Sequence, residues 1–459
     1  MIALSTHKAR RDALHTRVGR PILLMGNQDR IRNLPMNAVP FRQDSTFLYF
    51  TGCDVPGAAA LVDETGCTLF LAPPADDDAL WHGHADTVAD VQARYGVERI
   101  ADIADLEALV PSHAATVAVG DTQATARAGR HTNQTLRYQD GDAALVDAII
   151  GMRRNKTAEE LAEHRIAAGF TAAAFKAAMS ATRPGGHEAH IAALFDAVLA
   201  ARGCTTGYHS IVTVRGEVLH MPHYENALEA GQLLLLDGGA ERPSGYGVDI
   251  TRTWPVEGTF NGRQRAAYSA VLESQLEAIA MCRAGTRYRD IQLHTGRVLA
   301  RWLLDEGLLR GSMDEVMDKH AAAVFFPHGV GHLLGMDVHD LEQFGDRAAY
   351  AAGRDRSPHF GTAYLRLDLD LEPGHLVTIE PGFYVVPAIL RDPTMRETFG
   401  TTVNWDAAEE WLPFGGIRIE DDILVTDGDP EVLTHETPKT IAEVEALVGR
   451  GPSALERLS

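Results

Sequence analysis

Short apolar runs alternate with amphipathic stretches through the first third of the chain. Four of these runs have the length and content of buried strands, at residues 21–25, 58–62, 68–72 and 116–119. Helical periodicity lies between them near 87–95 and 143–150. Such alternation predicts an α/β domain over residues 1–150. Because no glycine-rich loop follows any of the strands, we expect no nucleotide site there.

The most distinctive stretch of this first part is aromatic. It runs from Phe41 to Gly52 as FRQDSTFLYFTG and ends at a turn. Two interpretations stay open: the aromatic rings pack in the domain core, or they form a contact surface that faces a second domain or subunit. This half contains no combination of acid, base and nucleophile, so we expect it to support a site that lies elsewhere.

Residues 151–156 form a charged run that we interpret as a linker to a second domain at 157–459. Thr157 and Glu160 have the spacing of a helix capping box. Helices are expected at 157–182, 188–202, 263–282 and 289–304. They carry no obvious chemistry, and we expect them to form the layer that covers a sheet.

A hairpin in this second part ends both of its strands near acids. The apolar run from Leu233 ends in Asp237, and the chain returns through a glycine-rich turn to Asp249. This spacing is typical of a hairpin whose two carboxylates face each other on one side of a sheet. Burying an unpaired carboxylate is costly and two opposed carboxylates repel, so the pair needs a shared proton or metal ion.

The same pattern recurs nearer the C-terminus. A second apolar run ends in Glu380, and a second return strand brings Glu420, which indicates an internal duplication with a long insertion at 387–413. Period-2 alternation places Arg418 on the same face as Glu420. Tyr384 shares a face with Glu380 if that strand stays regular.

Between the two hairpins lies the stretch HGVGHLLGMDVHD, which contains His328, His332 and His339. Each acid or histidine alone is more often structural. Four carboxylates with one or two histidines, however, make an oxygen-rich site that suits Mn, Fe, Co or Zn in a dinuclear arrangement. Two such ions can activate one hydroxide at neutral pH. The glycines of this stretch indicate an irregular loop that lets the backbone approach the ions and the substrate.

Composition narrows the class of protein. The 459 residues carry a net charge of −21, which argues against nucleic-acid binding through phosphates. The four cysteines form no CxxC pair, which excludes a zinc site of that type and fits a reducing compartment. No apolar run has membrane-spanning length, and residues 1–20 lack the core of a signal peptide. We therefore expect a cytoplasmic protein without nucleic-acid or membrane partners.

Five motifs occur in the order LLLLDGG, VDITRT, HGVGHLLGMDVHD, TIEPGFY and GIRIEDD. Together they resemble the pita-bread metallopeptidases, specifically the Xaa-Pro branch that contains aminopeptidase P and prolidase. The resemblance runs from Phe41 to about Asp422. It implies an α+β protein, with a pita-bread (creatinase/aminopeptidase-like) catalytic domain at 157–459 and a smaller α/β, aminopeptidase P-like domain at 1–150.

This resemblance implies a dinuclear metal site and its reaction. Asp249 and Glu420 would bridge two divalent ions. Asp237 would bind one of the ions, and His332 and Glu380 would bind the other. Mn²⁺ is the first expectation, with Co²⁺ or Zn²⁺ as alternatives. A metal-bridging hydroxide would attack the carbonyl that precedes proline, and Glu380 would act as the general base.

Further residues match family positions around the reacting bond. His220 matches a histidine that contacts the scissile region, although His223 is a competitor nearby. His339 matches a residue that binds substrate and stabilises the tetrahedral intermediate, and His328 matches one at a subsite. Tyr384 and Arg418 match a pair that supports the site. The expected catalytic set is Glu380, His339, His220, Arg418 and Tyr384.

Two subtypes of the Xaa-Pro branch compete. Phe41–Gly52 resembles the N-terminal domain of aminopeptidase P, so an Xaa-Pro aminopeptidase is the first expectation. The context of Arg366 and the long insertion resemble bacterial prolidase, in which an arginine holds the free carboxylate of a dipeptide. Arg366 in that role would bind substrate and favour Xaa-Pro dipeptides. The plain alternative is a surface arginine.

Two more distant alternatives and the expected partners complete this interpretation. A peptide-binding module without activity is disfavoured, because all five ligand positions hold the expected residue. A related fold that acts on creatine or a phosphotriester is a third class. The expected substrates are proline-containing peptides. The resemblance also implies a homodimer or homotetramer in which the N-terminal domain reaches toward a neighbour's site, with Phe41–Phe50 as the candidate contact.

Overall fold

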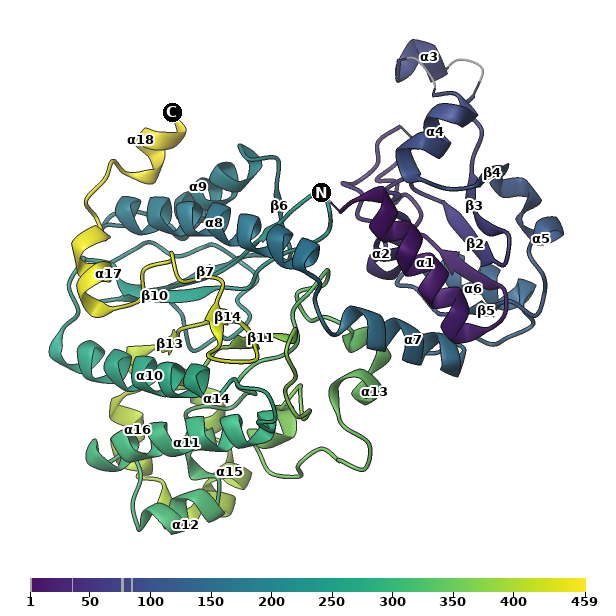
Figure 1. The fold of residues 1–459 in the computed structure, drawn as a ribbon. Helices are drawn as coiled ribbons and strands as arrows, with labels where there is room; N and C mark the ends of the chain where they lie inside the picture. The colour runs from purple at the N-terminus through teal and green to yellow at the C-terminus, as the bar shows by residue number, and fades with distance from the viewer. Residues whose placement is uncertain (1, 35, 76–77, 84–85) are drawn as a thin grey trace. The chain divides into compact units, whose positions relative to one another are not determined.

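The computed structural model describes residues 2–34, 36–75, 78–83 and 86–459. The chain divides into two compact units (Figure 1). The first comprises Met1–Arg153 with Leu341–Ala348, and the second comprises Arg154–Asp340 with Ala349–Ser459. Within the described ranges, no helix is long and apolar enough to cross a membrane. The four cysteines are buried free thiols.

A mixed five-stranded sheet forms the centre of the first unit. Its strand order is β4-β3-β2-β1-β5, with β2 antiparallel to both of its neighbours. The strands are β1 (Ile22–Met25), β2 (Ala59–Asp63), β3 (Gly66–Leu71), β4 (Arg99–Asp102) and β5 (Ala115–Thr116). The first three predicted apolar runs are therefore strands, whereas the fourth, at 116–119, overlaps β5 only at Thr116. The sequence pattern missed β4, whose four residues are only partly buried.

Helices pack against this sheet, which accounts for the burial of β1 and of most of β2 and β3. Helix α1 contacts β2 and β3 on one face, and α6 contacts β1. The helices of this unit are α1 (Leu4–Val18), α2 (Ser45–Thr51), α3 (Asp78–Trp81), α4 (Val88–Tyr95), α5 (Leu106–Leu109), α6 (Thr122–His131) and α7 (Ala143–Arg153). Residues 151–153, expected in a linker, are the last residues of α7.

The aromatic stretch at 41–52 contains helix α2, which Asp44 caps through the amide of Phe47. Every residue of α2 is buried, and Phe47 and Phe50 are fully so. The burial of residues 45–51 supports the core interpretation for α2, whereas Phe41 and Arg42 before it are only partly buried. A contact of this stretch with a neighbouring subunit stays a prediction. A helix buried on all sides has no polar face, so its sequence lacks the periodicity that marks a helix.

The second unit repeats one arrangement, a helix pair over an antiparallel hairpin. In the first copy α8 packs against α9, and α9 contacts the sheet β10-β8-β7. Its elements are α8 (Ala158–Ala181), α9 (Glu188–Ala200), β6 (Thr205–Thr206), β7 (Ile211–Thr213), β8 (Leu233–Asp237), β9 (Ala240–Glu241) and β10 (Thr251–Pro255). The predicted capping box of Thr157 and Glu160 starts α8.

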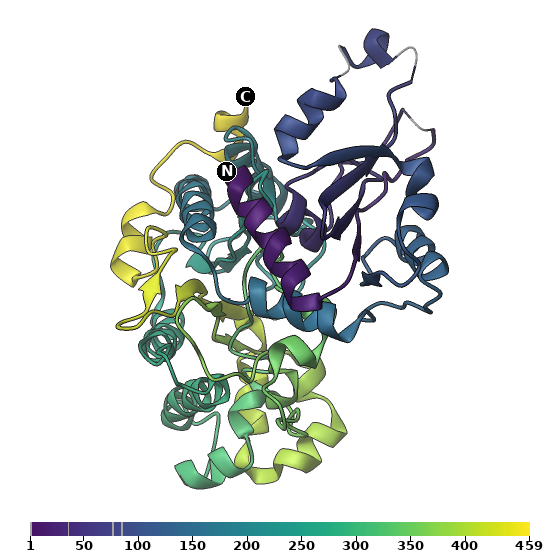
Figure 2. The same cartoon turned by 45° about the vertical axis from the view of Figure 1, so that its right-hand side comes forward.

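In the second copy α10 packs against α11, and Figure 2 shows this teal and green pair nearly along the helix axes. The strands form the sheets β11-β14-β15 and β12-β13. The elements are α10 (Gly262–Ala280), α11 (Tyr288–Asp305), β11 (Leu376–Ile379), β12 (Gly382–Tyr384), β13 (Gly416–Arg418), β14 (Asp421–Leu424) and β15 (Glu431–Val432). The predicted internal duplication is thus visible in the structure as two helix pairs, each with an acid-bearing hairpin.

Short helices complete the chain. The insertion at 387–413 folds as α14, α15 and α16, after which Trp411 and Phe414 pack against Phe383. The remaining helices are α12 (Met313–Asp318), α13 (Asp346–Ala349), α14 (Pro387–Leu390), α15 (Pro393–Phe399), α16 (Trp405–Glu410), α17 (Ile441–Leu447) and α18 (Ala454–Leu458). These contacts add Trp411 and Phe414 to the aromatic cluster around Phe383 of β12.

Candidate metal centre

The first acid hairpin brings two carboxylates together at one end of its strands. Asp237 is the last residue of β8, and Asp249 lies just before β10. A Cβ atom at Gly239 would lie 1.7 Å from the carbonyl oxygen of Val248, so only glycine lets the two arms approach this closely. The hydroxyl of Tyr208 lies between the carboxylates and is hydrogen-bonded to Oδ1 of each.

The second hairpin is joined to the first by hydrogen bonds. Glu380 follows β11, and Glu420 precedes β14. The Glu420 amide donates to the carbonyl of Thr251 at 3.0 Å, and the Thr251 hydroxyl donates to Oε2 of Glu420 at 2.7 Å. Arg252, which is fully buried, donates to the carbonyl of Glu420. Strand β10 therefore holds Glu420 next to the acids of the first hairpin.

The histidine stretch lies alongside β11 without forming a helix. The amide of Thr378 donates to the carbonyl of His332 at 3.0 Å, and the amide of His332 donates to the Thr378 hydroxyl at 3.1 Å. A Cβ atom at Gly331 would lie 2.2 Å from the carbonyl oxygen of Thr378 and 2.4 Å from the hydroxyl of Tyr288. The predicted irregular loop is confirmed, and Gly331 lets it pack tightly against β11.

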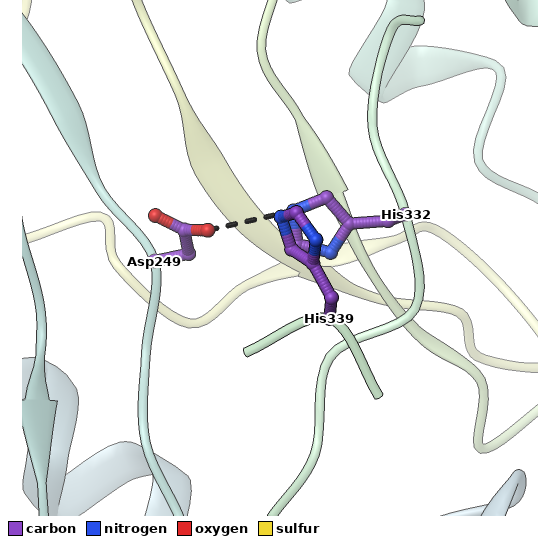
Figure 3. Close-up of side chains that lie close together, drawn as sticks. All are labelled: Asp249, His332 and His339. Carbon is purple, nitrogen blue, oxygen red and sulfur yellow. Dashed lines mark ion pairs between the residues drawn. The ribbon is translucent and has the colours of Figure 1, made fainter. Parts of the chain in front are cut away.

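Among the described residues, potential metal-ligand atoms converge in three overlapping groups, and the atoms of each group lie within 4.8 Å of one another. Figure 3 shows the third group, where Nε2 of His332 lies 3.4 Å from Oδ2 of Asp249. The ring of His339 lies against that of His332, with centroids 4.1 Å apart. The groups are Asp237–Asp249–Glu420, His332–Glu380–Glu420 and Asp249–His332–His339. All five predicted ligands meet here, and His339 also lies within ligand range.

The chemistry of these donors fits divalent cations. Asp237, Asp249, His332 and Glu420 are at most 8% exposed. Oε1 of Glu420 is buried and has no hydrogen-bond partner among the described residues. A buried carboxylate oxygen without a partner is costly, and a cation would satisfy it. Carboxylate oxygens with one imidazole are the donor set that Mn²⁺ and similar ions accept.

The protonation equilibria point in the same direction. Burial raises the pKa of Glu380 to about 7. Burial and the charge of Asp249 raise the pKa of Glu420 well above its usual range. Burial disfavours a charged His332, but its hydrogen bond with Asp249 and the charge of Glu380 outweigh burial and raise its pKa to about 9. Without ions the cluster therefore retains protons, which bound cations would displace.

The other ring nitrogen of His332 is engaged by the backbone. Its Nδ1 lies 2.9 Å from the carbonyl oxygen of Leu333, and a protonated Nδ1 would donate to this oxygen. A hydrogen bond of this kind sets the tautomer and the orientation of a ligating imidazole. Nε2 is then the nitrogen that faces the carboxylates of Asp249 and Glu380.

A chain of hydrogen bonds runs from the acids to His328. The guanidinium of Arg418 donates to Asp237 at 2.5 Å and to the hydroxyl of Tyr384 at 3.1 Å. That hydroxyl lies 2.9 Å from Nε2 of His328, whose Nδ1 lies 2.8 Å from the carbonyl oxygen of Gly329. Burial lowers the pKa of His328 to about 3, so its ring is neutral and Nε2 accepts from Tyr384. The predicted pair of Tyr384 and Arg418 is thus in direct contact.

The remaining predicted residues lie at the edge of this cluster. His220 keeps a solvent-exposed surface, but desolvation of its ring by neighbouring groups, together with the charges of Arg418 and Arg366, lowers its pKa. Arg366 is half-buried and also lowers the pKa of His328. The structure therefore places Arg366 close enough to His220 and His328 to influence both electrostatically.

Sequence reasoning missed four residues that hold the acids in place. Tyr208 bonds Asp237 and Asp249, Thr251 bonds Glu420, and Thr378 bonds the His332 backbone. The carboxylate of Asp422 accepts from the amide of Asp249 at 3.2 Å. Thr251, Thr378 and Asp422 stand inside the motifs VDITRT, TIEPGFY and GIRIEDD, so their proximity in sequence to the ligands was a usable signal. Tyr208 has no such context in the sequence.

Two family profiles match this chain. The profile of metallopeptidase family M24 matches residues 162–427, and the aminopeptidase P N-terminal domain matches residues 7–119. The chain is 33% identical to a probable Xaa-Pro aminopeptidase of Emericella nidulans, covering 94% of this chain and 93% of the relative. It is 35% identical to a probable Xaa-Pro aminopeptidase of Penicillium rubens, covering 89% of each.

Solved structures are similar over nearly the full length. The Pseudomonas aeruginosa aminopeptidase PepP superposes with a TM-score of 0.81 at 30% identity, covering 97% of this chain and 98% of that chain. Zinc-substituted Escherichia coli aminopeptidase P in complex with product gives a TM-score of 0.78 at 28% identity, with the same coverage. The expected fold class, a pita-bread catalytic domain with a smaller N-terminal domain, is confirmed.

Proposed function

This chain belongs to metallopeptidase family M24, and from that premise we propose that it acts as an Xaa-Pro aminopeptidase. Such an enzyme hydrolyses the bond between the first residue of a peptide and a proline in second position. The observation that carries the proposal is the buried convergence of Asp237, Asp249, His332, Glu380 and Glu420. Its substrates are peptides with proline as the second residue.

We assign these five residues to two divalent ions. Glu420 belongs to the group with Asp237 and Asp249 and to the group with His332 and Glu380, which supports two neighbouring ion positions that share it. Asp249 is assigned as the second shared ligand, because it lies near both Asp237 and His332. Mn²⁺ is the proposed metal, with Co²⁺ or Zn²⁺ as alternatives. When bound, the ions would supply Lewis-acid chemistry that activates water at neutral pH.

Glu380 is the proposed general base. Its carboxylate lies beside the ligand imidazole, with Oε1 3.6 Å from Nε2 of His332, and would take a proton from the attacking water. In the metal-free site, burial raises the pKa of Glu380 to about 7. Its Oε2 lies 3.8 Å from Nδ1 of His328, on the side of the cluster that leads toward Tyr384 and Arg418.

The histidines outside the assigned ligand set would hold the peptide. His339 lies half-buried beside His332, where its ring can donate to an oxygen of the reacting carbonyl. His328, neutral and held by Tyr384, offers a fixed polar surface on the other side of Glu380. His220 stands at the exposed edge near Arg418 and Arg366. Together they are proposed to orient the bond that precedes proline.

The competing function is an Xaa-Pro dipeptidase, which Arg366 would support. Its guanidinium is half-buried and lowers the pKa of both His220 and His328, so it could pair with the free carboxylate of a dipeptide. A tripeptide extends beyond that position and would not use this contact. The two functions therefore differ in what Arg366 contributes to each substrate.

The test compares hydrolysis of Xaa-Pro and Xaa-Pro-Yaa peptides by the wild type and by Arg366→Ala. The aminopeptidase proposal predicts faster cleavage of the tripeptide by the wild type and little change in Arg366→Ala. A selective loss of dipeptide cleavage, about 10- to 100-fold for a lost charged hydrogen bond, would support the dipeptidase instead. Arg283→Ala, which removes a surface partner of Asp429, is the matched control.

Two further proposals concern the setting of the enzyme. The four buried free thiols support a reducing compartment, so we propose the cytoplasm. We also propose a homodimer or homotetramer, as the family resemblance implies. Light scattering of the purified protein tests the oligomer, and a single-chain mass would contradict it.

A further inference from the structure

The loop that carries His339 closes around a buried ion pair outside the ligand set. Nζ of Lys156 lies 2.9 Å from Oδ2 of Asp340, and both side chains are only 1% exposed. Asp340 directly follows His339 in the chain. An ion pair buried this deeply recovers little more than the cost of desolvating its two charges, so stability alone does not account for it.

The Asp340 end of the pair is joined to the loop in two ways. The Asp340 amide donates to the carbonyl of Leu333 at 3.0 Å, and Nδ1 of His332 lies 2.9 Å from the same oxygen. A Cβ atom at Gly335 would lie 2.1 Å from Oδ2 of Asp340, so the chain folds directly over the carboxylate. The carboxylate is therefore the point around which the loop turns back toward the metal centre.

The Lys156 end is fixed to elements that do not belong to the loop. Its amide donates to the carbonyl of Gly374 at 2.8 Å, just before β11. The next residue, Thr157, caps α8. Lys156 therefore connects the loop to β11, which leads to Glu380, and to α8. A shift of this ammonium would move the return of the loop relative to the strand that carries the acids.

We propose that the Lys156–Asp340 ion pair positions His339 against the metal centre, so that both residues set the efficiency of substrate use without touching substrate. The inference rests on the proposed function, because it takes His339 to bind the peptide. Lys156 and Asp340 are thus positioning residues, and their effect must pass through His339.

The experiment replaces both charges at once, because either single change leaves an uncompensated buried charge that can prevent folding. Lys156→Met with Asp340→Asn keeps the size of both side chains. We expect this neutral pair to fold and to bind Mn²⁺ in the wild-type amount. Its kcat/KM on an Xaa-Pro-Yaa peptide should fall about tenfold, and the loss should disappear when the pair is introduced into His339→Ala. If the neutral pair does not fold, Lys156→Arg replaces it. Its loss in kcat/KM is likewise expected to disappear in the His339→Ala background.

Three results separate the inference from the function on which it rests. If the fold-decreases in kcat/KM of the neutral pair and of His339→Ala multiply in the combined variant, the pair acts independently of His339. This result would overturn the inference but not the proposed function. Unchanged kcat/KM in the folded neutral pair would also overturn it. Unchanged kinetics in His339→Ala itself would overturn the proposed role of His339 as well. Arg265→Met with Glu445→Gln removes a partly exposed pair between α10 and α17 and serves as the control without kinetic effect.

Discussion

At Glu420, one carboxylate oxygen accepts from Thr251 while the other is buried without a hydrogen-bond partner in the described chain. Arg418 offsets the charge of Asp237 directly, and its charge reaches Glu420 only at longer range. Burial therefore raises the pKa of Glu420 well above its usual range, because the charge of Arg418 offsets only a small part of the effect of burial. A buried carboxylate such as Glu420 therefore destabilises the metal-free fold. Cations bound beside it would make its contribution to the stability of the fold favourable.

Glu380→Gln tests the proposed base at this scale. The amide keeps the size of the side chain but cannot take a proton, so kcat should fall about 10²- to 10⁴-fold while the fold is kept. Steady-state kinetics and circular dichroism measure the two effects. Glu436→Gln, at an exposed position, is the control and should leave kcat unchanged. Turnover near the wild-type rate in metal-loaded Glu380→Gln would rule out the assigned role.

Among the elements, the contact between β11 and the histidine stretch places the histidine ligand. The stretch forms no helix, Leu333 makes an isolated antiparallel bridge with Val377, and the backbone bonds to Thr378 hold His332 beside Glu380. Gly331 allows this approach because a side chain at that position would collide with backbone and with Tyr288. The position of the histidine ligand therefore depends on a glycine that is not itself part of the site.

Gly331→Ala should separate the loop from β11. The added methyl would lie 2.2 Å from the carbonyl oxygen of Thr378, and backbone cannot move away as a flexible side chain could. We expect Mn²⁺ content and activity to fall together, with a loss of stability of about 1–3 kcal/mol. Elemental analysis and thermal denaturation provide the readouts. Gly296→Ala in α11 meets no atom within 4 Å and should retain metal and activity.

Across the whole molecule, the site is assembled from segments that are far apart in the chain. Thr251 and Glu420 are 169 residues apart in sequence, and Arg418 and Asp237 are 181 residues apart. The two acid hairpins belong to the two repeated halves of the second unit, so the site exists only when both halves are folded. Metal binding should therefore stabilise this unit as a whole.

Removing the metal ions with a chelator should lower the stability of the second unit by an amount that depends on pH. In the metal-free fold, the pKa of Glu380 rises from 4.5 to about 7 and that of His332 from 6.5 to about 9. The folded state then binds more protons than the unfolded chain across these windows, so metal-free stability falls as the pH rises through them. The drop in Tm on adding EDTA should be larger near pH 9 than near pH 6.5. A larger drop at the lower pH would contradict this sign.

The sequence pattern alone located the long helices of the second unit and most strands of the two sheets that matter for the fold and the site. Apolar runs located β1, β2, β3, β5, β8 and β11, and the capping box of Thr157 located the start of α8. The pattern missed helices whose buried residues are polar and helices whose residues are all buried. Helix α1 escaped notice because His7, Arg10 and Arg11 form most of its buried face, and they bond backbone of α2. Helix α2 is buried throughout and has no polar face to reveal its period.

The candidate ligands could be named from sequence because they stand at the ends of apolar strands, where local patterning reveals them. Their meeting point could not, because it depends on hydrogen bonds between distant segments, such as those of Tyr208, Thr251 and Arg418. The burial of Lys156 with Asp340 likewise has no signature in either local sequence. The sequence by itself thus determined which residues carry the chemistry. Only the tertiary structure decided how they face one another, because close packing positions side chains that the chain order keeps apart.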